Sequence, residues 1–182
     1  MSSSSTKTQT AKRKRLPSNI TLSTAFLGPI DTIIKDLFIG IFHDYCERFK
    51  VSPSKKPIHV AIAGVEAGKA ADPNQFGLTI STDDRILIHI NDPSLDDESA
   101  GDLSHEYISV KFVEVVCHEM VHAMQSITNR NPQSFGKIKH DRESSVESYF
   151  FDAHEVEARI LESFYTNVFG VELQAVCLDE SE

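Results

Sequence analysis

This sequence has no run of apolar residues as long as the ~18 that a membrane-spanning helix requires, and no signal peptide opens it. It also has little cysteine. The chain has three cysteines, Cys46, Cys117 and Cys177, and an odd number argues against a disulfide framework. No two of them form a Cys-x-x-Cys pair, which argues against a thiolate zinc site. We therefore expect an intracellular protein in a reducing compartment, without membrane association.

The spacings that bind nucleotides and calcium are missing as well. Gly64 and Gly68 belong to a turn-rich segment but do not match a phosphate-binding loop. The segment from Asn91 to Glu106 is rich in carboxylates, yet it lacks the spacing of an EF-hand. We predict a solvated acidic loop there, with a calcium-binding loop as the alternative.

Basic residues are few outside the N-terminus. The chain has 18 basic and 27 acidic residues, and five of the basic ones lie in the first 20 residues, which contain no acid. The remaining body therefore has 13 basic residues against 27 acidic ones, a net charge of −14. Such a body argues against binding of nucleic acid, except through the basic tail.

The composition predicts two regions. Residues 1–20 are rich in Ser and Thr and lack aromatics, so we expect a disordered basic tail, followed by one domain over residues 21–182. Within the tail, the basic residues of Lys12–Pro17 favour a simple solubilising role. The alternatives are a nuclear-import address, a nucleic-acid contact and a strap on the acidic body.

Hydrophobic periodicity predicts the elements of the domain. An amphipathic helix begins at Pro29, with apolar residues at three- and four-residue steps. A buried strand is expected over residues 58–63, and a hairpin over residues 76–90 whose Ile86, Ile88 and Ile90 face the core. Two long helices follow, over residues 104–128 and 142–169.

The first of these two helices carries the motif His118-Glu119-Met120-Val121-His122. Two histidines four residues apart lie on one side of a helix and can bind one zinc ion, with Glu119 as general base toward a zinc-bound water. At ~100° per residue both histidines project away from the apolar side of the helix. That side comprises Phe112, Val116, Met120, Ala123, Met124 and Ile127. The alternative is an exposed polar helix that merely contains two histidines.

The third zinc ligand is expected on the second long helix. The apolar side of this helix comprises Val146, Phe150, Ala153, Leu161, Phe164 and Val168. Glu157 falls in the middle of that side, where an ionised carboxylate is costly unless it is paired or bound to a metal. Glu155 is expected on the opposite side. We therefore predict Glu157 as the ligand; the alternatives are a buried pair with Lys or Arg and a different rotation of the helix.

Together, the motif and Glu157-Ala158 resemble the zincin metallopeptidases whose third zinc ligand is a glutamate. The strand Ile86–Asn91, before the motif helix, is similar to the edge strand that pairs with extended substrate in this family. The match is closest to small ImmA/IrrE-like or phage-type zincins.

Other zincin groups match less well. Leu161 stands where thermolysin-like members carry an aspartate, and Gln125 and Thr128 stand where metzincins carry Gly and His. His140 follows the motif at a distance similar to the third histidine of SprT-like proteases, although that family has Gly at the next position. His140 is therefore an alternative third ligand.

The resemblance implies an α/β (α+β) zincin-like domain with a small mixed sheet, a backing helix, the motif helix and a C-terminal glutamate helix. It implies zinc held by His118, His122 and Glu157, a protein or peptide substrate, and Glu119 as general base. His154 is the further catalytic candidate, stabilising the oxyanion; Tyr149 and Tyr165 compete for that role. The rival is a non-catalytic binding or structural protein, such as a virion or regulatory component, that keeps the fold but does not need Glu119.

Overall fold

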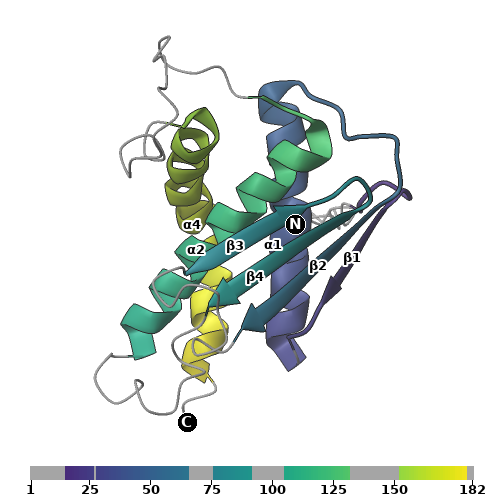
Figure 1. The fold of residues 1–182 in the computed structure, drawn as a ribbon. Coiled ribbons are helices and arrows are strands. Elements are labelled where there is room, and N and C mark those ends of the chain that lie inside the picture. Colours follow the sequence, from purple (N-terminus) through teal and green to yellow (C-terminus); the bar gives the residue numbers. More distant parts are fainter. Residues whose placement is uncertain (1–14, 27, 66–75, 92–104, 132–151, 180–182) are drawn as a thin grey trace, which may run out of the picture.

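A computed structural model of the chain describes residues 15–26, 28–65, 76–91, 105–131 and 152–179. In these ranges a four-stranded mixed sheet lies against three helices (Figure 1). The elements are β1 (Ile20–Thr24), α1 (Gly28–Phe49), β2 (Ile58–Val65), β3 (Gly77–Ser81), β4 (Arg85–Asn91), α2 (His105–Thr128) and α4 (Ala153–Asp179). The expected mixed α/β class is confirmed. Within the described ranges, no helix combines the length and the apolar character needed to cross a membrane.

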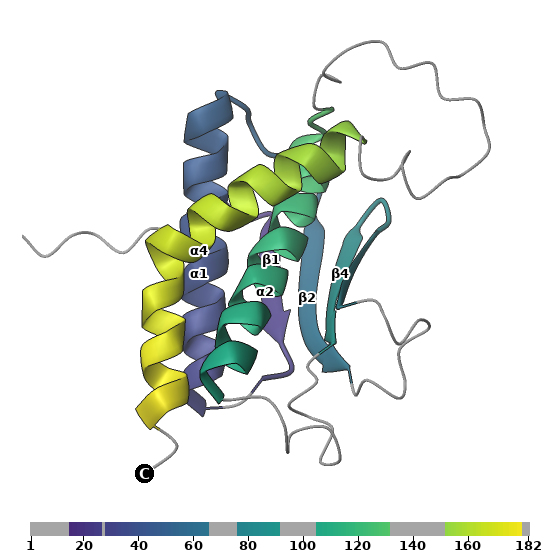
Figure 2. The same cartoon turned by 90° about the vertical axis from the view of Figure 1, so that its left-hand side faces the viewer.

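The sheet has the strand order β1-β2-β4-β3, with β1, β2 and β4 parallel and β3 antiparallel to β4. All three helices lie on one face of it (Figure 2). Successive side chains of a strand point to opposite faces, and Ile86, Ile88 and Ile90 of β4 are buried in the core toward the helices. The predicted hairpin and its core-facing isoleucines are confirmed.

The edge of the sheet differs from the expectation. Residues 86–91 were expected as the edge strand, but β4 lies inside the sheet, paired with β2 on one side and β3 on the other. The short turn after β3 returns the chain directly beside it, and the backbone N–H of Thr82 donates to the oxygen of Arg85 at 2.8 Å. Among the described strands, the edge next to α2 is therefore β3.

The folded body begins earlier than the composition suggested. Ile20 opens β1, pairs with Ile58 and is buried. The side-chain amide of Asn19 donates to the backbone oxygens of Ser54 at 2.8 Å and Lys56 at 2.9 Å. Residues 15–20 therefore belong to the body, because their polar groups are bonded to a distant loop that composition cannot reveal. Residues 1–14 lie outside the described part of the chain.

α2 packs between the sheet and α4 (Figure 2). Its predicted apolar side is confirmed, since Val116, Met120, Ala123, Met124 and Ile127 are completely buried. α1 likewise buries residues at three- and four-residue steps, among them Ile34, Phe38, Ile41, Phe42 and Tyr45. The motif helix is thus fixed from two sides, which leaves its polar side facing the start of α4.

α4 is rotated relative to the expectation. Ala158, Leu161 and Tyr165 are buried, whereas Phe164 and Val168 are 37% and 51% exposed. Tyr165 turns inward because its hydroxyl donates to Asp44 of α1 at 2.9 Å. Centring the buried stripe on these three residues places Glu155 and Glu157 on its two opposite flanks. The helix also continues past Gly170 to Asp179, and residues 142–151 of the predicted helix lie outside the described ranges.

Candidate metal centre

The two motif histidines converge on one point. They lie one turn apart on α2, and their Nε2 atoms are 3.1 Å apart. Their side chains are only 16% and 18% exposed. The pair is therefore enclosed between α2 and α4, which argues against the alternative of a merely exposed polar helix.

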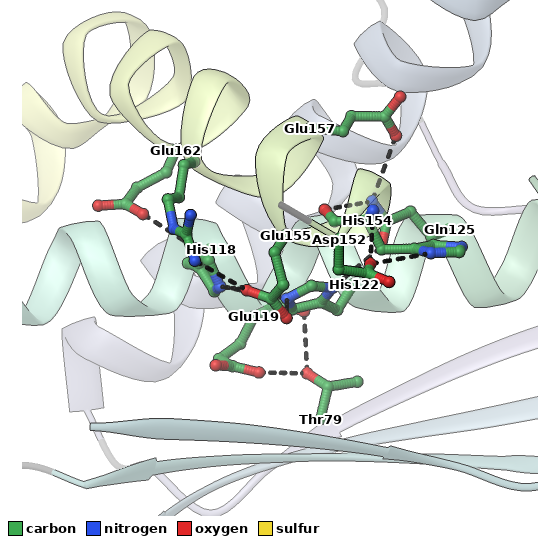
Figure 3. A network of polar contacts seen from close by, with 11 residues as sticks. Thr79, His118, Glu119, His122, Gln125, Asp152, His154, Glu155, Glu157 and Glu162 are labelled. Carbon is green, nitrogen blue, oxygen red and sulfur yellow. Dashed lines mark hydrogen bonds and ion pairs between the residues drawn. The ribbon is translucent and has the colours of Figure 1, made fainter. Parts of the chain in front are cut away.

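Glu155, in the first turn of α4, completes a cluster with them (Figure 3). Its Oε2 is 3.4 Å from Nε2 of His118 and its Oε1 is 3.2 Å from Nε2 of His122. Ligand atoms bound to a tetrahedral zinc at ~2.0–2.1 Å are roughly 3.3 Å from one another. The Nε2–Nε2 separation is close to that value, and each histidine has one oxygen of Glu155 at a similar distance. His118, His122 and Glu155 could therefore hold a metal ion.

Glu157, the predicted ligand, lies on the other flank of α4. Its carboxylate accepts hydrogen bonds from Nη2 of Arg130 at 2.7 Å and from the hydroxyl of Tyr45 at 2.6 Å. Burial alone would raise the pKa of Glu157, but the bonds from Arg130, Tyr45 and Gln125 hold it below its ordinary value of 4.5. This corrects the prediction: the counter-charge of the half-buried Glu157 is a guanidinium, which was one of the alternatives, and Glu155 is the carboxylate beside the histidines.

Outer partners orient both imidazoles. Nδ1 of His118 is 2.9 Å from Oε2 of Glu162, and Nδ1 of His122 is 2.9 Å from Oε1 of Gln125. Both partners are acceptors, so each Nδ1 can donate to its partner, and Nε2 is the atom left to face the shared point. A histidine binds a metal through Nε2 once that nitrogen has lost its proton. The donor set therefore fits zinc in atom type.

Electrostatics at this point favour positive charge. Burial alone would lower the pKa of His118, but hydrogen bonds to Glu155 and Glu162 raise it to about 9. The pKa of His122 is raised in the same way, by Glu155 and Gln125 against the effect of burial. The carboxylates that stabilise positive charge on the histidines would also stabilise a divalent cation bound beside them.

Glu119 lies on the sheet side of the cluster (Figure 3). It is only 6% exposed, and the hydroxyl of Thr79 lies 2.7 Å from its Oε2 and 3.0 Å from its backbone oxygen. Burial raises the pKa of Glu119, and the hydrogen bond from Thr79 and the two histidines only partly offset this. A carboxylate of this kind can accept a proton and later return it.

A groove of about 460 Å³ runs beside these residues. β3 is one of its walls, and the start of α4 contributes His154 and Glu155. The remaining lining residues are Glu119, His122, Gln125, Ser126 and Arg130, on or just after α2. The lining is mostly polar and follows a sheet edge, so an extended chain can lie along it.

The other predicted site residues have different positions. His154 lines the groove, with Nδ1 3.4 Å from Oδ1 of Asp152 and a side chain that is 41% exposed. Tyr165 is instead bonded to Asp44 on α1. His140 and Tyr149 lie outside the described residues. Of the oxyanion candidates that the structure describes, only His154 is in the groove.

Sequence reasoning placed Glu155 on the side of the helix away from the site, and it gave Glu162 and Thr79 no role. Glu155 and Glu162 are two helical turns apart and so share one side of α4, a signal that could have identified them as a pair. Thr79 gave no signal, because it reaches Glu119 from a strand 40 residues earlier in the chain.

Comparisons of the chain with protein-family models, curated protein sequences and solved structures find no match. What the centre can do therefore follows from its own residues.

Proposed function

We propose that this protein is a zinc-dependent metallopeptidase that cleaves extended peptide segments. One observation carries the proposal: His118, His122 and Glu155 form a group that could hold a metal ion, and the buried carboxylate of Glu119 lines the groove beside it. A purely structural metal site has no use for a carboxylate with a raised pKa beside its ligands.

His118, His122 and Glu155 would hold the ion, and zinc when bound acidifies a water molecule and polarises a carbonyl oxygen. Glu119 accepts the proton lost by the attacking water and donates it to the leaving amine. His154, which lines the groove, would donate a hydrogen bond to the oxygen on which negative charge develops.

The sheet edge supports a peptide as the substrate class. Alternate backbone groups of an edge strand have no partner within the sheet, so an extended peptide can add as a further strand. β3 is such an edge among the described strands, and it borders the groove that contains Glu119. If the backbone of the peptide pairs with β3, preference for particular peptide side chains would come from the polar residues of α2 and α4 across the groove.

The test compares wild type with Glu119→Gln. Both proteins should contain about one zinc per chain after loading, as measured by elemental analysis. Wild type should cleave members of a peptide library, read by mass spectrometry, and the variant should be slower by at least ~100-fold. Zinc binding without cleavage by wild type would support a non-catalytic metal protein instead. Absence of zinc binding would exclude the centre itself.

A further inference from the structure

The edge strand β3 touches Glu119 at Gly77. A Cβ atom built on Gly77 would lie 2.6 Å from both Cγ and Oε1 of Glu119, closer than the 3.0 Å that real Cβ atoms respect. The φ angle of Gly77 is outside the left-handed region, so conformational freedom is not what requires glycine here. The missing side chain leaves the space that the carboxylate occupies.

Two residues further along β3, on the same face of the strand, Thr79 provides the second contact. Its hydroxyl donates to Oε2 of Glu119 at 2.7 Å. Ser81, again two residues on, continues the pattern, with its Oγ 2.8 Å from Oγ of Ser126 on α2. The side of β3 that faces α2 is therefore made of small residues that match the helix surface around Glu119.

We propose that Gly77 and Thr79 are positioning residues for Glu119: Gly77 leaves the space for the carboxylate, and Thr79 fixes one of its oxygens. The strand whose outer edge would bind peptide then also sets the direction of the general base. The catalytic meaning of this inference rests on the proposed function, but the two contacts can be tested without any activity.

The first experiment uses thermal unfolding of the full-length protein in a double-mutant cycle. Gly77→Ala should lower Tm by ~4 °C or more in wild type, because an overpacked buried contact is costly. In a Glu119→Ala background, where the carboxylate is gone, the same change should lower Tm by less than ~1 °C. An equal loss in both backgrounds would overturn the role of Gly77.

The second experiment compares Thr79→Val, which keeps the β-branched shape, with Thr79→Ser, which keeps the hydroxyl. Thr79→Val should lower kcat by roughly tenfold or more with KM within about twofold, since only the orientation of the base is lost. Thr79→Ser should restore most of kcat, and both should retain zinc. Wild-type kcat in Thr79→Val would contradict the role of Thr79. If wild type itself cleaves nothing, the proposed function fails, and the Tm cycle still decides whether β3 positions Glu119.

Discussion

Two carboxylates on α4, only two residues apart, have opposite surroundings. Glu157 is enclosed by Arg130, Tyr45 and Gln125, so its counter-charge is part of the chain. Glu155 faces the Nε2 atoms of two histidines, and its contact with a guanidinium, that of Arg159, is a long one of 3.9 Å. Figure 3 shows the two side chains pointing in different directions from the same helix.

The difference separates a structural ion pair from a candidate metal site. A guanidinium is always charged, so the Glu157 cluster is complete at any ordinary pH. The histidines beside Glu155 supply positive charge only when they are protonated or when they share a metal ion. A buried carboxylate therefore needs a nearby positive charge. An arginine supplies that charge from within the chain, whereas a pair of histidines must first take up a proton or a metal ion.

The largest effect should come from exchanging the carboxylate that lies beside the two histidines. Glu155→Gln removes the anionic oxygen next to both histidines and should weaken zinc binding by about 100-fold or more, measured by competition with a chelator. Glu157→Gln is the matched control and should change zinc affinity by less than about fivefold, because the three ligand atoms stay in place. Reversed outcomes would return the ligand role to Glu157.

The next effect concerns the closed ion pair. Arg130→Ala leaves Glu157 buried beside Tyr45 and without its guanidinium, which should destabilise the protein by about 2–3 kcal/mol. Arg159→Ala should cost under ~1 kcal/mol, because the contact of Arg159 with Glu155 is long and its side chain is 33% exposed. Urea unfolding of both variants provides the comparison. Equal costs would mean that the two carboxylates are not held differently.

The smallest effect is a dependence on pH. The pKa of His118 is raised to about 9 from an ordinary value of 6.5, so its contribution to stability is complete below pH 6.5 and is lost as the pH rises through 9. Chelator-treated protein should therefore be more stable at pH 6 than at pH 9.5, by about 1 kcal/mol. Glu162→Gln should reduce this difference, since it removes one of the carboxylates that raise the pKa of His118. A stability that rises with pH over this range would contradict the assignment.

Much of the fold was accessible from periodicity. The apolar stripes of α1 and α2 and the alternation in β4 are local signals, and the positions of His118, Glu119 and His122 on the motif helix follow from them. The short strand β1 was missed because Ile20–Thr24 is half polar and is held in place by its pairing with β2.

Which carboxylate of α4 lies beside the two histidines could not be predicted in the same way. Its choice depends on the rotation of α4, which is set by contacts with distant residues: Tyr165 turns inward to Asp44, and Phe164 stays at the surface with the guanidinium of Arg48 4.2 Å from its ring centre. Hydrophobicity ranks Phe164 above Tyr165, so the apolar pattern pointed to the wrong flank. The rotation of α4 therefore depends on its contacts with α1, which the sequence of α4 alone does not reveal.

The sheet edge at β3 also bears on self-association of the protein at high concentration. Among the described strands β3 is an edge, and an edge strand can pair with the edge of a second molecule as readily as with a peptide. Ile80 on this strand is 42% exposed and Phe76 just before it is 49% exposed, which adds apolar surface to the same place. Self-association through β3 would occupy the groove. Under the proposed function, the concentrated protein would then compete with its substrate for this groove.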